Sequence, residues 1–178
     1  MSTNGEWKAQ LQAVFERGVK AYDEMGARLP SECFGEEDSA FLASIGCPTQ
    51  VLYDFVEDWC WAKEPAFEEV VGVVSLRREA YLAAGGDRAA GVPVPASQFP
   101  PGTASLEGIS WLPRILAKAR AILRGELPPQ LMYGCGGDRP FLSTYGVGLA
   151  EFLEVVKRAG GNDSAVAAFL KARAQGRG

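Results

Sequence analysis

Apolar residues recur at spacings of three and four along most of the chain, the spacing that places them on one face of an α-helix. Helices with this pattern are predicted over residues 6–25, 38–45, 48–61, 65–84, 110–124, 138–145, 149–159 and 163–174. The valine-rich centre of the fourth segment, Val70 to Val74, also fits a strand, which ranks second. We therefore expect an all-α fold with strand content near zero.

The composition changes sharply between the two groups of predicted helices. Gly85 and Gly86 end the fourth helix, and the chain continues as GGDRAAGVPVPASQFPPGT. Its prolines interrupt helices and strands alike. We expect an N-terminal helical half over 1–86, a Gly/Pro-rich linker over 87–104 and a C-terminal helical half over 105–178.

The two halves read alike at a constant offset of 100 residues. The stretch DSAFLASIGC, from Asp38, aligns with DRPFLSTYGV, from Asp138. Both carry Asp, Phe-Leu and Gly at matching positions, and apolar positions follow in each. The pattern favours an ancient internal duplication, in which residues 38–58 and 138–158 form the same helix-turn-helix unit.

Local signals assign several charged residues to helix ends. Asp38 and Asp138 each begin a predicted helix, where a carboxylate accepts bonds from free N–H groups and meets the positive end of the helix dipole. Arg77 and Arg78 fall late in a helix, where cations are favoured. We interpret the two aspartates as N-caps and the arginine pair as a solvated helix end, too short to be a nucleic-acid patch.

Composition limits the environments and partners to consider. The chain has 178 residues, 47% of them apolar, which suffices for a core without metals or disulfides. Its net charge of −4 gives little attraction for nucleic acid. The N-terminus, MSTNGEWKAQ, lacks a signal-peptide pattern, and no apolar run is long enough for a membrane span. We expect a cytoplasmic protein that has no nucleic-acid or membrane partner and no metal or cofactor.

The residue types available for catalysis are limited, because histidine is absent and the cysteines are far apart in the sequence. It contains no histidine, which removes the Ser/His and Cys/His arrangements. The cysteines Cys33, Cys47, Cys60 and Cys135 form no CxxC pair, and we read them as reduced thiols. An enzyme would have to use Asp, Glu, Cys, Tyr or Lys, whose ordinary pKa values lie far from neutral. Catalysis is therefore the less favoured interpretation.

Three stretches of the second half carry a family resemblance. They are GISWLPRILAKARAILRGELP (108–128), YGCGGDRPFL (133–142) and the run from Gly146 that ends in EFLEVV at Val156. In these stretches the chain resembles a bacterial family, domain of unknown function 5069. The resemblance implies a small helical domain. It brings no established activity, so no catalytic residue is carried over.

The second half also holds the candidate binding site. Trp111, Arg114 and Lys118 are spaced by three and four, so they share one side of a helix. The loop over 126–137 must return past this helix, which would bring Tyr133 and Arg139 to the same cleft. The three cations would create a positive potential that favours a carboxylate, a phosphate or an acidic peptide.

The alternative is that this cluster is structural. In that case Glu107, Glu126 and Asp138 neutralise the cations within the fold.

Two functional hypotheses follow. The first is a non-enzymatic helical binding or interaction module whose halves form a cleft for a small anionic ligand or an acidic partner segment. The second is a small enzyme that uses Asp, Cys and Tyr in the loop from Tyr133 to Arg139, which includes Cys135 and Asp138.

Overall fold

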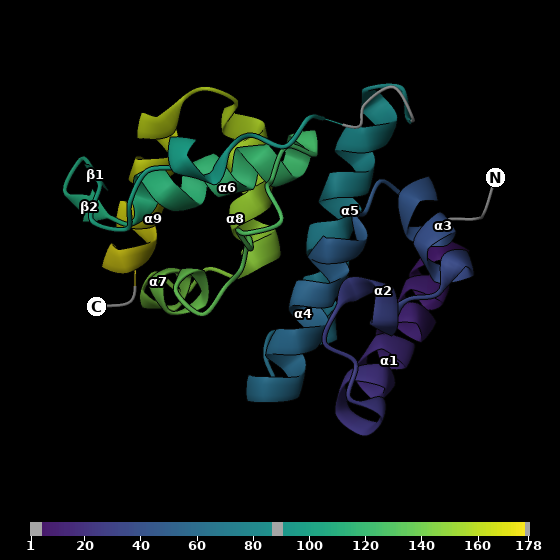
Figure 1. Cartoon of the computed structure of the whole chain (residues 1–178). Helices are drawn as coiled ribbons and strands as arrows, with labels where there is room; N and C mark the ends of the chain where they lie inside the picture. Colours follow the sequence, from purple (N-terminus) through teal and green to yellow (C-terminus); the bar gives the residue numbers. More distant parts are fainter. Residues whose placement is uncertain (1–4, 87–90, 177–178) are drawn as a thin grey trace. The chain divides into compact units, whose positions relative to one another are not determined.

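A computed structural model describes residues 5–86 and 91–176. It divides into two compact units, Met1–Ala90 and Gly91–Gly178, each of which is described by itself (Figure 1). Helices dominate both, so the all-α prediction is confirmed. Among the described residues, no helix is both long and apolar enough to cross a membrane.

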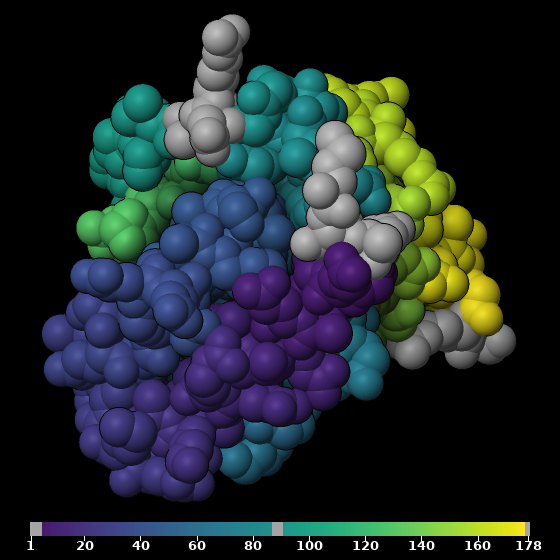
Figure 2. Space-filling view, turned by 90° about the vertical axis from the view of Figure 1, so that its right-hand side faces the viewer, coloured from purple at the N-terminus to yellow at the C-terminus, as the bar shows by residue number. Residues whose placement is uncertain are grey.

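The described residues of the first unit, 5–86, form helices and the turns that join them. Its elements are α1 Glu6–Met25, α2 Pro30–Cys33, α3 Glu36–Ser44, α4 Thr49–Ala62 and α5 Phe67–Ala83. Helices α1 and α4 pack against each other, and α5 also contacts α1 (Figure 1). The strand alternative at Val70 to Val74 is wrong, because these residues lie inside α5. Figure 2 shows the purple surface of α1 beside the blue surface of the helices that follow it.

A close contact between α1 and the segment after α2 closes the core of the first unit. Gly18 is buried in α1, and Phe34 is 2% exposed. A Cβ atom on Gly18 would lie 2.7 Å from the Phe34 ring and 3.0 Å from a methyl of Val56. Only a residue without a side chain therefore fits at this point of the helix.

The second unit combines helices with a small hairpin. Its elements are a 3-10 turn Ala96–Gln98, β1 Ser105–Leu106, β2 Ile109–Ser110, α6 Leu112–Arg124, α7 Asp138–Thr144, α8 Leu149–Ala159 and α9 Asp163–Gln175. Helix α8 contacts α6, α7 and α9. The hairpin was not predicted. Glu107 and Gly108 both have positive φ, as a tight two-residue hairpin turn requires.

Most of the predicted linker, 87–104, belongs to the second unit instead. Its residues 87–90 lie outside the described part of the chain. The backbone N–H of Val94 donates to the carbonyl of Glu126 at 2.9 Å. Gly102 lies against the ring of Trp111, where a Cβ atom would come within 2.4 Å. From Gly91 onward the prolines therefore shape an ordered, packed segment rather than a spacer.

The turns at the aligned positions use the same hydrogen bonds in both units. The N–H of Cys47 donates to the carbonyl of Leu42, and the N–H of Val147 donates to that of Leu142. The glycines before them, at positions 46 and 146, have φ values of 70° and 63°. The local match is consistent with a duplication, which stays a prediction.

Candidate functional site

Lys118 and Asp138 form a buried ion pair in the second unit. The Lys118 Nζ lies 2.5 Å from the Asp138 Oδ2. Lys118 is 1% exposed and Asp138 is 0% exposed. The binding-site prediction placed Lys118 at an open cleft, and this was wrong: its position in α6 faces the core, between the buried Ile115 and Ile122.

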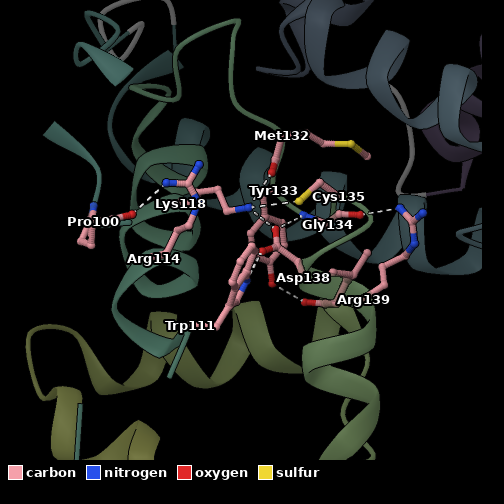
Figure 3. Close-up of polar contacts among 11 residues, drawn as sticks. Pro100, Trp111, Arg114, Lys118, Met132, Tyr133, Gly134, Cys135, Asp138 and Arg139 are labelled. Carbon is pink, nitrogen blue, oxygen red and sulfur yellow. Dashed lines mark hydrogen bonds and ion pairs between the residues drawn. The ribbon is translucent and has the colours of Figure 1, made fainter. Parts of the chain in front are cut away.

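The ammonium of Lys118 has an acceptor for each of its three protons (Figure 3). Besides Asp138, Nζ contacts the carbonyl of Met132 at 3.0 Å and the Sγ of Cys135 at 3.4 Å. A buried cation is tolerated when its charge and its hydrogen bonds are both matched. This lysine meets both conditions within its own unit.

The carboxylate of Asp138 is matched in the same way. Its Oδ1 accepts from the indole Nε1 of Trp111 at 2.9 Å, and its Oδ2 also accepts from the backbone N–H of Gly134 at 2.9 Å. The N-cap interpretation of Asp138 is wrong, because the N-cap of α7 is Gly137. That of Asp38 is wrong too, since α3 begins at Glu36. The Asp138 side chain turns inward because a cation and two donors converge on it.

Trp111 forms one wall of this network. It precedes α6 in the left-handed conformation, with φ of 73°. Its ring lies against Gly102 and Gly137, where added Cβ atoms would approach to 2.4 and 2.5 Å. The Lys118 Nζ lies 6.0 Å from the ring centroid. The glycines thus leave room for the indole to reach Asp138.

The remaining predicted site residues each donate to a different backbone carbonyl. The hydroxyl of the buried Tyr133 donates to the carbonyl of Leu149 at 2.8 Å. The Nη1 of Arg114 donates to Pro100 O at 2.8 Å, and the Nη1 of Arg139 donates to Gly134 O at 2.6 Å. Figure 3 shows the two arginines on opposite sides of the central ion pair.

The alternative, in which Glu107, Glu126 and Asp138 neutralise the cations, is correct for one of these three carboxylates. Asp138 neutralises Lys118, as that alternative required. Glu107 pairs instead with Lys171 at 2.8 Å, and Glu126 pairs with Arg124 at 2.7 Å. The network is therefore a closed polar core rather than an open cation cluster.

A pocket of about 380 Å³ lies in the first unit, outside every predicted site. Its lining comprises Trp7, Gln10, Phe41, Ser44, Ile45 and Arg78. It is formed by the start of α1, the end of α3 and α5. Three apolar and three polar side chains contribute to its lining.

Arg78 is the charged residue of this pocket. Its guanidinium carbon lies 5.1 Å from the centroid of the Trp7 ring, within cation–π range. Its buried Nε has no hydrogen-bond acceptor. Within the described residues, no carboxylate forms an ion pair with it. The donor set of this arginine is therefore open to an added anion.

The solvated-end interpretation of the arginine pair is wrong. Arg77 is 4% exposed, and burial lowers its pKa. Its spacing from Val70, Val74 and Tyr81 places it on the apolar stripe of α5, and this signal was available in the sequence. For Arg78 no such signal exists, because only the fold brings α5 to Trp7.

Burial raises the pKa of several other titratable groups in the described chain. All four cysteines are free thiols, and burial raises the pKa of Cys47 to about 12 and that of Cys60 to about 11. Burial also raises the pKa of Asp54 to about 7. Across residues 5–86 and 91–176, no group of His, Cys, Asp and Glu side chains is placed to hold a metal ion.

Residues 100–178 match the model of a protein family described as a domain of unknown function (DUF5069). The resemblance in the second half is thereby confirmed. Comparisons with curated proteins and with solved structures gave no match.

Proposed function

We propose that the protein is a non-enzymatic helical module that binds a small anionic ligand in its first unit, because the second unit holds Lys118 and Asp138 as a closed, buried ion pair. The pocket lined by Trp7 and Arg78 is the proposed site. The observation that carries the proposal is the partly buried Arg78, whose Nε has no acceptor and whose charge has no carboxylate partner in the described chain.

An anion would satisfy what Arg78 lacks. Buried N–H donors are nearly always paired in folded proteins, so an unpaired one invites an acceptor. A carboxylate or phosphate accepts two parallel bonds from a guanidinium, and such charge-assisted bonds are about twice as strong as neutral ones. The cation–π contact with Trp7 holds the guanidinium plane in place.

The rest of the lining indicates an organic anion. Phe41 and Ile45 add apolar walls, and the amide of Gln10 adds a donor and an acceptor. Ser44 already donates its hydroxyl to the carbonyl of Phe41 at 2.7 Å, so its oxygen remains as an acceptor. A small organic carboxylate could accept from Arg78 and Gln10 while its carbon atoms contact Phe41.

The burial of the Lys118–Asp138 pair supports the proposal that the protein is not an enzyme. Lys118 and Asp138 are buried against each other, and each of their polar atoms has a partner. A general acid or base must reach the proton that it transfers in a bound substrate. Neither side chain has access to such a substrate, so their role is to hold α6, α7 and the loop between them.

We place the protein in the cytoplasm, without a nucleic-acid partner. Free cysteines are typical of a reducing compartment. The net charge of −4 disfavours a phosphate backbone.

The test is calorimetric titration of the full chain with benzoate and, separately, with inorganic phosphate. We expect measurable benzoate binding, weakened about 10- to 100-fold in Arg78→Ala through the lost charge-assisted bonds. Arg17→Ala is the matched control, because it removes one exposed cation from the same unit. Its affinity should stay within about twofold of wild type. Equal affinities in Arg78→Ala and wild type, or no binding of either probe, would refute the proposal.

A further inference from the structure

Cys135 and Lys118 form a thiol–amine pair that the closed core leaves partly accessible. The Nζ–Sγ distance is 3.4 Å (Figure 3). Lys118 is buried, whereas Cys135 is partly exposed and precedes the exposed Gly136. We propose that Cys135 is a peroxide-modification site at which oxidation joins its sulfur to the Lys118 nitrogen in a sulfenamide bond.

The reaction needs one peroxide molecule and balances in two steps. First, the sulfur of Cys135 attacks a peroxide oxygen, the O–O bond breaks, and a sulfenic acid and water form. Next, the ammonium of Lys118 passes a proton to Asp138, and the freed amine attacks the sulfur. The S–N bond forms, the S–O bond breaks, and the departing hydroxide takes an N–H proton to leave as water. Sulfur loses two electrons, and the peroxide gains them.

Asp138 makes this step electrically feasible in a buried site. Its Oδ2 lies 2.5 Å from the lysine nitrogen and is placed to receive the proton. This proton transfer neutralises Lys118 and Asp138 at the same time, so no unpaired charge stays in the core. An unpaired buried charge would be strongly destabilising.

The position of Cys135 in the sequence also favours the lysine as partner. Sulfenic acids usually condense with a nearby thiol, but the other cysteines all lie at or before Cys60, in the first unit. Within its own unit Cys135 has no second thiol. Gly136, which follows Cys135, is exposed and has nothing within 4 Å of its Cβ position, so this side of the loop offers little steric resistance to closing the gap.

The test is mass spectrometry of the full-length protein after treatment with hydrogen peroxide, followed by peptide mapping. We expect the intact mass to fall by two hydrogens, and a cross-linked peptide pair to contain residues 118 and 135. Dithiothreitol should restore both peptides. Cys135 found only as sulfinic or sulfonic acid, an unchanged Cys135, or a bridge that retains an oxygen atom would overturn the proposal.

Two variants separate this reaction from general oxidation. Cys135→Ser should lose the cross-link while keeping the fold, because serine retains an acceptor for Lys118. Lys118→Arg keeps the cation and should leave Cys135 as a sulfenic acid that a dimedone probe traps. Cys60, whose pKa burial raises to about 11, serves as an internal control and should react more slowly. A cross-linked mass in Cys135→Ser would assign the bridge elsewhere and refute the proposal.

Discussion

The two units share a turn but fill the core next to it with different chemistry. In the first unit, Gly18 on α1 lies against the ring of Phe34. In the second unit, Lys118 on α6 and the backbone N–H of Gly134 in the following loop both contact the carboxylate of Asp138, so the core there holds an ion pair. One unit closes this part of its core with an apolar contact, and the other closes it with a polar network.

The difference indicates which charged side chains stabilise the fold and which are available to a ligand. The second unit has its lysine and aspartate matched internally, at the risk of a large penalty if either is lost. The first unit packs Gly18 against Phe34 and leaves the Nε of Arg78 without an acceptor at the pocket. The buried charge is therefore a structural element, and the open arginine is the candidate for binding.

The largest effect should come from Asp138→Ala, which leaves Lys118 buried without its counter-ion. We expect the free energy of unfolding to fall by about 3–5 kcal/mol. The matched change Asp38→Ala breaks the pair with Arg17, whose side chain is 54% exposed, and should cost at most about 1 kcal/mol. Urea unfolding gives the energies, and hydrogen exchange with mass spectrometry assigns each loss to its unit.

A double variant sharpens this result. Lys118→Met combined with Asp138→Leu removes both charges and should be more stable than Asp138→Ala alone. Equal losses in Asp138→Ala and Asp38→Ala would mean that the buried pair is no more important than the surface pair.

The next largest effect should be a change in the pH dependence of stability when the buried carboxylate of Asp54 is removed. Burial raises the pKa of Asp54 from about 4 to about 7, so the folded state holds a proton that the unfolded state releases. Its contribution to stability is complete below about pH 4 and is lost as the pH rises to about 7. Asp54→Asn should therefore stabilise the protein at pH 8 by about 1–4 kcal/mol and change little at pH 4.

Glu154 is the matched control, because its exposed carboxylate pairs with Arg158 on the surface of α8. Glu154→Gln should leave the pH dependence of unfolding unchanged. A stability curve that keeps its slope between pH 4 and 7 in Asp54→Asn would contradict the assignment.

The smallest stability effect should be that of Gly18→Ala. The added methyl would lie 2.7 Å from the Phe34 ring, and overpacking typically costs about 1–3 kcal/mol. The better helix propensity of alanine offsets part of this, about 0.5–1 kcal/mol. Gly35→Ala is the control, because nothing lies within 4 Å of its Cβ position. Urea unfolding should show a net loss for the first and almost none for the second; a gain for Gly18→Ala would show that Phe34 gives way.

The sequence predicted the helices well because their apolar spacing is local information. Residues 6–25 were expected to form a helix, and α1 is Glu6–Met25. The short hairpin at 105–110 and the four-residue α2 were missed, because segments this short carry too little periodicity. The linker prediction did not anticipate the packing at Gly102, whose missing side chain makes room for the ring of Trp111.

The candidate site was predicted only in part. Helical spacing placed Trp111 and Lys118 together, and both belong to the same network. Spacing did not show that Lys118 turns into the core, because its partner Asp138 lies on another helix. The pocket of Trp7 and Arg78 joins residues far apart in the chain, so it depends on tertiary packing that no local pattern records.

The most direct test of the central claim is an NMR titration of the full chain with benzoate that follows side-chain N–H signals. The Nε–H of Arg78 and the indole N–H of Trp7 should shift and saturate together. The indole N–H of Trp111, which donates to Asp138 in the closed core, should stay in place. A shift of Trp111 without a shift of Arg78 would locate the anion in the second unit and contradict the proposed site.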